Sequence, residues 1–228
     1  MLAGMASYDV IVIGAGVVGT WVAWHLAALG AGRVLVPDRG RIAEGTTAQS
    51  SGILRTHYSV PENVELARRS WPIFNEFADY LGDEDAAAGL VRCGYLIAAP
   101  EGPQLEPLRA ALEAQRAAGI PVELLDRRQA AERLPICRFD DAALIGFEPE
   151  AGFADATLVA TSFARAARRR GVKILEGTEV QRLRLAHGRV AGVATAAGDF
   201  DAPVVVSVQN IWAGELERWT GVTIPLRA

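Results

Sequence analysis

Cysteine, histidine and lysine are all scarce in this sequence of 228 residues. The two cysteines, Cys93 and Cys137, match neither a metal-binding spacing nor a C-x-x-C redox motif. Two thiols are too few for a disulfide scaffold, so we expect a reducing compartment, the cytoplasm. The three histidines form no sequence cluster with carboxylates, which argues against a metal site.

The sequence also lacks an excess of positive charge. A formal net charge of −4 gives no basic field that would attract nucleic acid or an anionic membrane. The longest apolar run, residues 10–29, is interrupted by Gly14, Gly16 and Gly19, and no basic segment precedes it. We therefore expect a buried strand followed by a buried helix there, and no membrane span.

This run opens a strand–turn–helix–strand pattern typical of a Rossmann-like α/β fold. Residues 8–13 are continuous and rich in β-branched side chains, as in a parallel strand covered on both faces. A G-x-G-x-x-G motif follows at 14–19, then a helix over 17–29 and a second strand over 33–36.

Each part of the motif has a physical role in dinucleotide binding. Gly14 permits a tight turn, Gly16 lets the backbone approach a pyrophosphate, and Gly19 allows close packing of helix on strand. Free N–H groups at the helix N-terminus favour phosphate. Asp38 lies 38 − 14 = 24 residues after the first glycine, near the spacing of about 20 expected for a ribose-binding acid. The candidate cofactor-binding residues here are Gly14, Gly16, Val17, Val18, Gly19, Asp38 and Arg39.

A loop of small residues at 44–58 favours FAD over NAD as the cofactor. Its hydroxyls and backbone amides suit a second wrap around a pyrophosphate and the edge of a flavin. An NAD-dependent enzyme stays possible only if this loop is ordinary. The candidate cofactor-binding residues of the loop are Thr46, Thr47, Ser50, Ser51 and Gly52.

With these motifs the sequence resembles the D-amino-acid oxidase-like superfamily, which contains sarcosine oxidase, glycine oxidase and dimethylglycine dehydrogenase. The resemblance covers essentially the whole chain, through the segments 12–19, 45–55, 94–96, 149–155 and 171–180 and through Trp212. It implies FAD and oxidation of a C–N bond by hydride transfer to the flavin. It also implies that the backbone of Val180 lies against the adenine, and that the turn at 50–52 lies near the pyrophosphate and flavin.

Four departures from the family pattern affect the expected site. Gln49 stands where some members carry a flavin-linked histidine, so we expect non-covalent FAD. Asn210 lies near the position of a family glycine before Trp212, and asparagine tolerates a positive φ better than most residues. The single lysine, Lys173, falls at the start of a strand rather than over the flavin.

The fourth departure is the end of the sequence at 224–228, a motif that in the family opens the second half of the substrate sheet. The C-terminal return to the flavin is therefore expected to be absent. The chain is then a fragment, a naturally short protein, or a subunit that a partner completes.

The remaining pattern divides the chain into two parts. We expect a discontinuous FAD-binding domain over 1–88 and 150–228, with a partial α+β substrate domain inserted at 89–149. An apolar stripe from Leu66 to Leu81 predicts a core-facing helix over 61–81. The other expected elements are strands at 90–99, 143–148, 172–175 and 204–208, helices at 104–118, after Asp126 and at 157–170, and a hairpin of 182–186 with 189–195.

Arg55 is the best candidate for a charge near the flavin or a substrate carboxylate, because its fork binds carboxylates in a bidentate way. His57 is a weaker catalytic candidate. The leading hypothesis is an FAD-dependent oxidase or dehydrogenase of a small secondary amine or amino acid, acting alone, as a homo-oligomer or with a partner subunit. The alternative is an FAD-binding fragment or subunit with no activity of its own.

Overall fold

The computed structural model describes residues 6–225, which form two compact units. Within the described residues, unit 1 comprises 6–50, 78–88 and 156–225, and unit 2 comprises 51–77 and 89–155. The inserted unit was expected over 89–149. Unit 2 also contains residues 51–77 and 150–155, which pack with this insertion.

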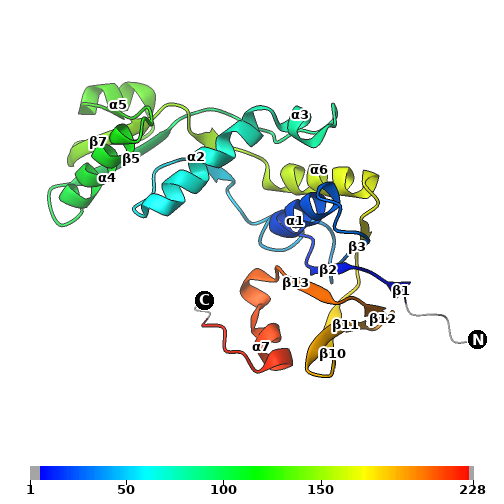
Figure 1. Cartoon of the computed structure of the whole chain (residues 1–228). Coiled ribbons are helices and arrows are strands. Elements are labelled where there is room, and N and C mark those ends of the chain that lie inside the picture. Colours follow the sequence, from blue (N-terminus) through cyan, green and yellow to red (C-terminus); the bar gives the residue numbers. More distant parts are fainter. Residues whose placement is uncertain (1–5, 226–228) are drawn as a thin grey trace, which may run out of the picture. The chain divides into compact units, whose positions relative to one another are not determined.

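Unit 1 contains a four-stranded parallel sheet in the order β13-β2-β3-β9 (Figure 1). Its register pairs Val10 with both Val204 and Val34, so β2 lies in the interior of the sheet. All four residues of β2 and of β3 are buried, as the continuous apolar runs predict. The strand bounds are β2 (Val10–Ile13), β3 (Val34–Pro37), β9 (Lys173–Leu175) and β13 (Val204–Ser207).

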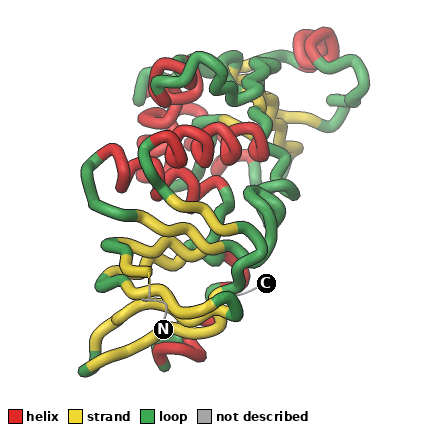
Figure 2. The backbone as a smooth tube through the Cα atoms, turned by 90° about the vertical axis from the view of Figure 1, so that its right-hand side faces the viewer, coloured by secondary structure: helices red, strands yellow, loops and turns green. Residues whose placement is uncertain are grey.

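Helices α1 (Val17–Ala28) and α6 (Ala156–Arg169) pack against each other, α1 also on β2 and β3 and α6 on β9. A second sheet, in the order β1-β12-β11-β10, completes the layers of this unit (Figure 2). The predicted hairpin turn is confirmed, since His187 and Gly188 have φ values of 52° and 74°. The bounds are β1 (Ala6–Ser7), β10 (Val180–Ala186), β11 (Arg189–Thr195) and β12 (Gly198–Asp201), followed by a 3-10 turn (Asn210–Trp212) and α7 (Gly214–Thr220).

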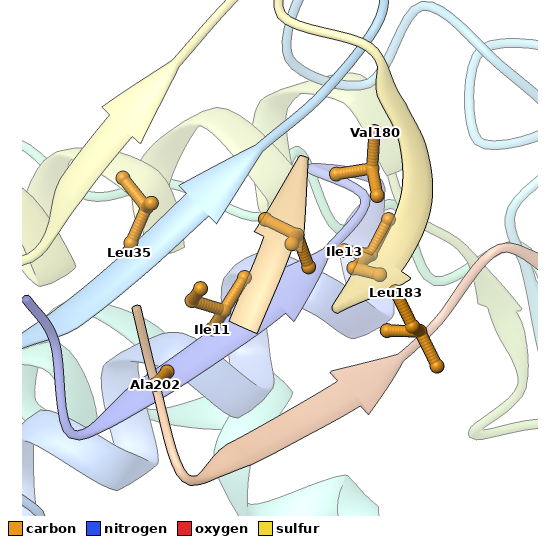
Figure 3. Packing of buried hydrophobic residues seen from close by; sticks show 7 residues of the cluster. Ile11, Ile13, Leu35, Val180, Leu183 and Ala202 are labelled. Carbon is orange, nitrogen blue, oxygen red and sulfur yellow. The ribbon is translucent and has the colours of Figure 1, made fainter. Parts of the chain in front are cut away.

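The core of unit 1 is formed between the two sheets. Ile11 and Ile13 of β2 lie against Val180 and Leu183 of β10, as Figure 3 shows. Successive side chains of a strand point to opposite faces, so the buried Val12, between Ile11 and Ile13, faces the helices. Because β10 contributes both to this core and to the edge of a cavity, the core positions part of the candidate site.

A short excursion of the chain, residues 78–88, is anchored to α6 within unit 1. The carboxylate of Asp83 is 2% exposed and forms ion pairs with Arg165, at 2.9 Å, and with Arg169. The hydrogen bond from Arg169 is the main cause that holds the pKa of Asp83 below its usual value. Ser162 of α6 adds a hydrogen bond to the carbonyl oxygen of Ala87, at 3.2 Å.

Unit 2 is built around a three-stranded antiparallel sheet in the order β5-β7-β6. The central strand, β7, is buried on both faces. Leu144 faces a cluster formed with α4, and the next residue, Ile145, faces a cluster that contains Ala130 of α5. The bounds are β5 (Tyr95–Pro100), α4 (Leu105–Ala117), β6 (Glu123–Leu124), α5 (Arg127–Arg133), β7 (Ala142–Glu148) and a separate pair, β4 (Ile53–Leu54) with β8 (Gly152–Phe153).

The helix predicted over 61–81 is interrupted. The structure has α2 (Pro61–Asn75) and α3 (Phe77–Leu81), separated by Glu76 with φ −121° and ψ 43°. The prediction of a core-facing stripe is wrong for α2, which has no buried residue, and Leu66 is 63% exposed. Periodicity identifies an amphipathic helix but does not determine whether its apolar face is covered.

None of the helices within residues 6–225 combines the length and apolar character needed to cross a membrane. The apolar run at 10–29 instead forms β2 and α1, with the glycine-rich turn between them. Of the terminal segment 224–228, residues Leu226, Arg227 and Ala228 lie outside the described part of the chain.

Candidate functional site

The turn between β2 and α1 requires glycine at two positions. Gly14 has a φ of 110°, in the region that favours glycine, and its N–H donates to the carbonyl of Pro37 at 3.0 Å. A Cβ at Gly19 would overlap the carbonyl oxygen of Gly14. The first and third motif glycines therefore fix the turn and the close approach of α1 to β2.

The N-terminus of α1 carries no negative charge of its own. Gly16 is its N-cap residue and provides no side-chain cap, and the first turn has no acidic residue. The hydroxyl oxygen of Thr47 instead accepts a hydrogen bond from the Val17 N–H, at 3.0 Å. A Cβ at Gly16 would lie 3.0 Å from that oxygen. A side chain at this position would therefore fill the space between the N-terminus of α1 and Thr47.

Asp38 follows β3 and connects two loops through its carboxylate. One oxygen accepts the N–H of Ala15 at 2.6 Å, and the other accepts the N–H of Gly40 at 2.7 Å. The expected ribose-binding acid therefore also holds the glycine-rich turn against the loop that follows β3.

These groups line a cavity of about 510 Å³ in unit 1. Of the predicted cofactor-binding residues, the cavity is lined by Gly14, Gly16, Asp38, Arg39, Thr46, Thr47 and Val180. Gln49 also lines it. For the other lining residues no binding role was expected from the sequence; they include Ile13, Pro37, Gly40, Glu44, Gly45, Glu179, Gln181, Val208, Gln209 and Glu215.

The chain returns to this cavity after β13. Asn210 has a φ of 49°, which agrees with the positive φ expected there, and its side-chain amide donates to the Thr46 hydroxyl at 2.9 Å. The guanidinium of Arg39 lies 4.3 Å from the ring centre of Trp212. A Cβ at Gly45 would meet the same indole at 3.3 Å, so the loop after β3 and the turn after β13 pack closely together.

The remaining predicted cofactor-binding residues do not line the cavity. Val17, Val18, Gly19 and Ser50 belong to unit 1 but lie outside its lining, and the side chain of Val18 is exposed. Ser51 and Gly52 belong to unit 2. The hydroxyl-rich pattern of the loop at 44–58 did not indicate that the chain passes from unit 1 to unit 2 between Ser50 and Ser51.

Arg55 lies in unit 2 between two aromatic rings. Its guanidinium is 4.7 Å from the ring centre of Tyr95 and 5.3 Å from that of Tyr58, and it donates to the Tyr95 hydroxyl. A guanidinium between aromatic faces is held in orientation while keeping further donors for a carboxylate.

His57, the second catalytic candidate, lies near this group. Its ring stacks on Tyr95 at a centroid distance of 6.3 Å, and its Nδ1 is 2.8 Å from Oε1 of Gln115. Thr56, between the two candidates, donates from its N–H and its hydroxyl to Oε1 of Glu148, at 2.8 and 2.5 Å. Sequence reasoning missed Gln115 and Glu148, because no local motif marks either residue.

The chain is similar to known proteins both in sequence and in structure. The mitochondrial pyruvate dehydrogenase phosphatase regulatory subunit of Mus musculus is 30% identical over 227 residues, which cover 98% of this chain and 25% of that protein. Sarcosine oxidase subunit beta of Arthrobacter sp is 28% identical, with coverage of 97% and 56%. The crystal structure of glycine oxidase from Geobacillus kaustophilus superposes with a TM-score of 0.85 at 26% identity, with coverage of 96% and 60%.

The chain therefore spans between a quarter and three fifths of the length of these relatives. The family model described as FAD dependent oxidoreductase (DAO) matches residues 9–228. The glycine-rich turn, the acid after β3 and the fold agree with that match, and the chain belongs to this family of FAD-dependent oxidoreductases, of the sarcosine and glycine oxidase type.

Proposed function

We propose that the chain is the cofactor-binding part of an oxidoreductase that oxidises the C–N bond of a small secondary amine or amino acid. Bound FAD would accept a hydride from the carbon beside the nitrogen. The observation that carries the proposal is the cavity of unit 1, where the glycine-rich turn, a helix N-terminus without acidic residues and Asp38 meet.

The residues present fit the nucleotide part of FAD. Gly14 and Gly16 bring backbone rather than side chains to the cavity, and the N-terminal amides of α1 suit a pyrophosphate. Asp38 would accept hydrogen bonds from the ribose hydroxyls, for which an acid at this position favours a free 2′-hydroxyl. The backbone at Val180, which lines the same cavity, would lie against the adenine.

The loop after β3 would complete the binding of the pyrophosphate and of the flavin edge. Thr46 and Thr47 bring hydroxyls to the cavity, and the amide of Asn210 holds Thr46. Gln49 lines the cavity and cannot form the covalent bond that a histidine makes in some family members. We therefore propose that FAD is bound non-covalently.

For the substrate we propose a carboxylate-binding role for Arg55 and a hydrogen-bonding role for His57. Arg55 is supported by its orientation between Tyr58 and Tyr95, which leaves a planar fork of donors. His57 is held at one ring nitrogen by Gln115, so that its other nitrogen is available for a ligand.

A first measurement is the absorbance spectrum of the purified chain, before and after denaturation. We expect flavin bands that remain in the supernatant once the protein is precipitated, because the cavity holds the cofactor without a covalent bond. Flavin that stays with the precipitate would contradict non-covalent binding.

The enzymatic proposal is then tested by mixing the flavin-loaded chain with N-methylglycine, L-proline, glycine and D-alanine without oxygen. Loss of the oxidised flavin band with one of them is the expected result. An unchanged band with all of these substrates, on a chain shown to hold FAD, would contradict catalysis by this chain alone.

A second candidate function is that of a flavin-binding subunit or part that needs another chain for activity. It is favoured by the share of each relative that the chain covers, and by two relatives that are named as subunits. A homo-oligomer would satisfy the same need. Addition of a candidate partner should restore turnover if this function is correct.

For the location we propose a reducing compartment, the cytoplasm. Cys93 and Cys137 are both exposed free thiols, which persist where thiols are kept reduced. Three relatives are named as mitochondrial, so fractionation of cells that express the chain should include both compartments.

A further inference from the structure

Unit 2 contains a series of buried polar side chains, the last of which contacts the catalytic candidate His57. Glu148 is 4% exposed, and its Oε1 accepts both hydrogen bonds from Thr56. Gln115 is 2% exposed, and its Oε1 lies 2.8 Å from Nδ1 of His57. Polar side chains as buried as these two normally have hydrogen-bond partners for their polar atoms.

Each of the two side chains also has one atom without a hydrogen-bond partner among the described residues. These atoms are Oε2 of Glu148 and Nε2 of Gln115, an acceptor and a donor. Glu148, Gln115 and His57 line one cavity of about 10 Å³, close to the smallest volume that holds a water molecule. No direct hydrogen bond joins the two atoms, so one water in this cavity is what would link them.

As a carboxylate, Glu148 would set the direction of the Gln115 amide. A carboxylate only accepts hydrogen bonds, and in a buried site its negative charge attracts the N–H end of an amide and repels the oxygen end. Across a water the preference is electrostatic, because a water that donates to the carboxylate can either accept from the amide N–H or donate to the amide oxygen. With Nε2 turned towards Glu148, the amide presents Oε1 to His57, as the structure shows.

The amide direction in turn fixes the proton of the imidazole. Oε1 of Gln115 can only accept, so Nδ1 of His57 must be the donor. In the neutral ring, Nε2 then has no proton and keeps a free lone pair.

We propose that Glu148, acting through Gln115, holds His57 in the Nδ1–H tautomer, so that Nε2 accepts a hydrogen bond from the ligand. Glu148 and Gln115 are positioning residues in this arrangement. The ligand group must be a donor, and under the proposed function, on which this last step rests, it is the N–H of the amine substrate. The opposite tautomer would place two donors against each other.

The tautomer can be measured directly, because the chain has three histidines. We would record long-range ¹H–¹⁵N correlations of the histidine-labelled full chain, above the usual range of histidine titration. His25 is an internal reference: its Nδ1 lies 2.9 Å from the Trp21 carbonyl and its Nε2 lies 2.7 Å from the Tyr80 hydroxyl. The Trp21 carbonyl oxygen can only accept, so we expect His25 to have the Nδ1–H form, with its Nε2 accepting from the Tyr80 hydroxyl. A His57→Asn variant assigns the His57 signals.

The decisive variant is Glu148→Gln. Its side-chain oxygen must still accept from Thr56, so its NH2 group points to Gln115. Gln115 then turns its oxygen to that group and its own NH2 to His57, which must accept at Nδ1. We expect the proton of His57 to move from Nδ1 to Nε2 in this variant. Glu150→Gln, the same change at an exposed carboxylate two residues along, should leave the Nδ1–H form in place.

The proposal is overturned if His57 of the unaltered chain has the Nε2–H form, or if folded Glu148→Gln keeps the Nδ1–H form. If Glu148→Gln does not fold, Gln115→Met decides the question, because it removes the acceptor and should leave His57 as a mixture of both tautomers. An unchanged Nδ1–H form in Gln115→Met would contradict the proposal. Neither flavin nor substrate is present, so this outcome is independent of whether the proposed function is correct.

Discussion

Asp38 has a structural role in the fold, and we propose that it also binds the ribose of the cofactor. Its two oxygens accept N–H groups from Ala15 and Gly40, which belong to the two loops that border the cavity. A carboxylate oxygen can accept more than one hydrogen bond, so these contacts leave capacity for a ribose. The cost of replacing Asp38 should therefore appear in both folding and binding.

We expect Asp38→Asn to weaken FAD binding about tenfold, since loss of a charged hydrogen bond costs about 1.5 kcal/mol. The variant should also unfold at a lower temperature, because its NH2 group would face a backbone N–H. Quenching of flavin fluorescence gives the affinity, and thermal unfolding gives the stability. Asp141→Asn, at an exposed carboxylate in unit 2, is the control. Equal affinity for FAD in Asp38→Asn and the unaltered chain would contradict the assigned role.

Local sequence could predict the residues of the glycine-rich turn, because their chemistry depends on neighbours in the chain. Gly14, Gly16 and Asp38, which we predicted to bind the cofactor, line the cavity, and Asn210 has the positive φ that asparagine tolerates. Gln115 and Glu148 could not be found in this way. They are common residue types, separated by 33 positions of sequence, and only the packing of α4 on β7 brings them together.

Among the elements, the clearest dependence on a single residue is the pair of β4 and β8. Gly52, which precedes β4, has a φ of 63°, and its carbonyl oxygen accepts the Ala154 N–H at 2.9 Å. A Cβ at Gly52 would overlap the Ala154 carbonyl oxygen. The residue therefore needs to be glycine for two reasons, its backbone conformation and the close approach of a second segment.

Gly52→Ala should lower the free energy of unfolding by about 2–5 kcal/mol, from left-handed backbone strain together with overpacking. Gly30→Ala is the matched control, because Gly30 has a φ of 72° and no atom lies within 4 Å of its missing Cβ. That control should cost about 1–2 kcal/mol, the backbone term alone. Denaturant unfolding of both variants measures the difference. Equal losses would show that the close approach to Ala154 contributes nothing.

Elements with an internal signal were predicted well. The capping box of Asp126 and Gln129 starts α5 where expected, and the turn at His187 joins β10 to β11. Elements without such a signal were missed, among them α7, whose residues show no clear apolar stripe, and the short strand β12. The interruption at Glu76 was also missed, because the transition between the two units there is a property of long-range packing.

On the scale of the whole molecule, Asp83 is the anchor of a segment that returns to unit 1 between two stretches of unit 2. The lowered pKa of Asp83 means that its ion pairs stabilise the fold fully above the ordinary aspartate pKa of 3.8. This contribution is lost as the pH falls through the lower pKa of the folded state. Since the ion pairs hold residues 78–88 on α6, acid should weaken unit 1 through this contact.

We expect Asp83→Asn to be less stable than the unaltered chain near neutral pH, with a difference that shrinks as the pH is lowered below about 3.8. Unfolding of both proteins across a pH series would measure it. Other carboxylates titrate in both chains, so they cancel in the difference. A stability difference that stays constant with pH would exclude a role for the Asp83 charge.

The order of strands in the parallel sheet has a consequence for synthesis on the ribosome. The neighbours of β2 and β3 on the two outer sides are β13 and β9, which come from the last third of the chain. Until these strands emerge, β2 and β3 form only a two-stranded pair, which is marginal in water. The glycine-rich turn is thus translated early but gains its support late, and we expect nascent chains to capture the nucleotide only after residues 204–212 have left the exit tunnel.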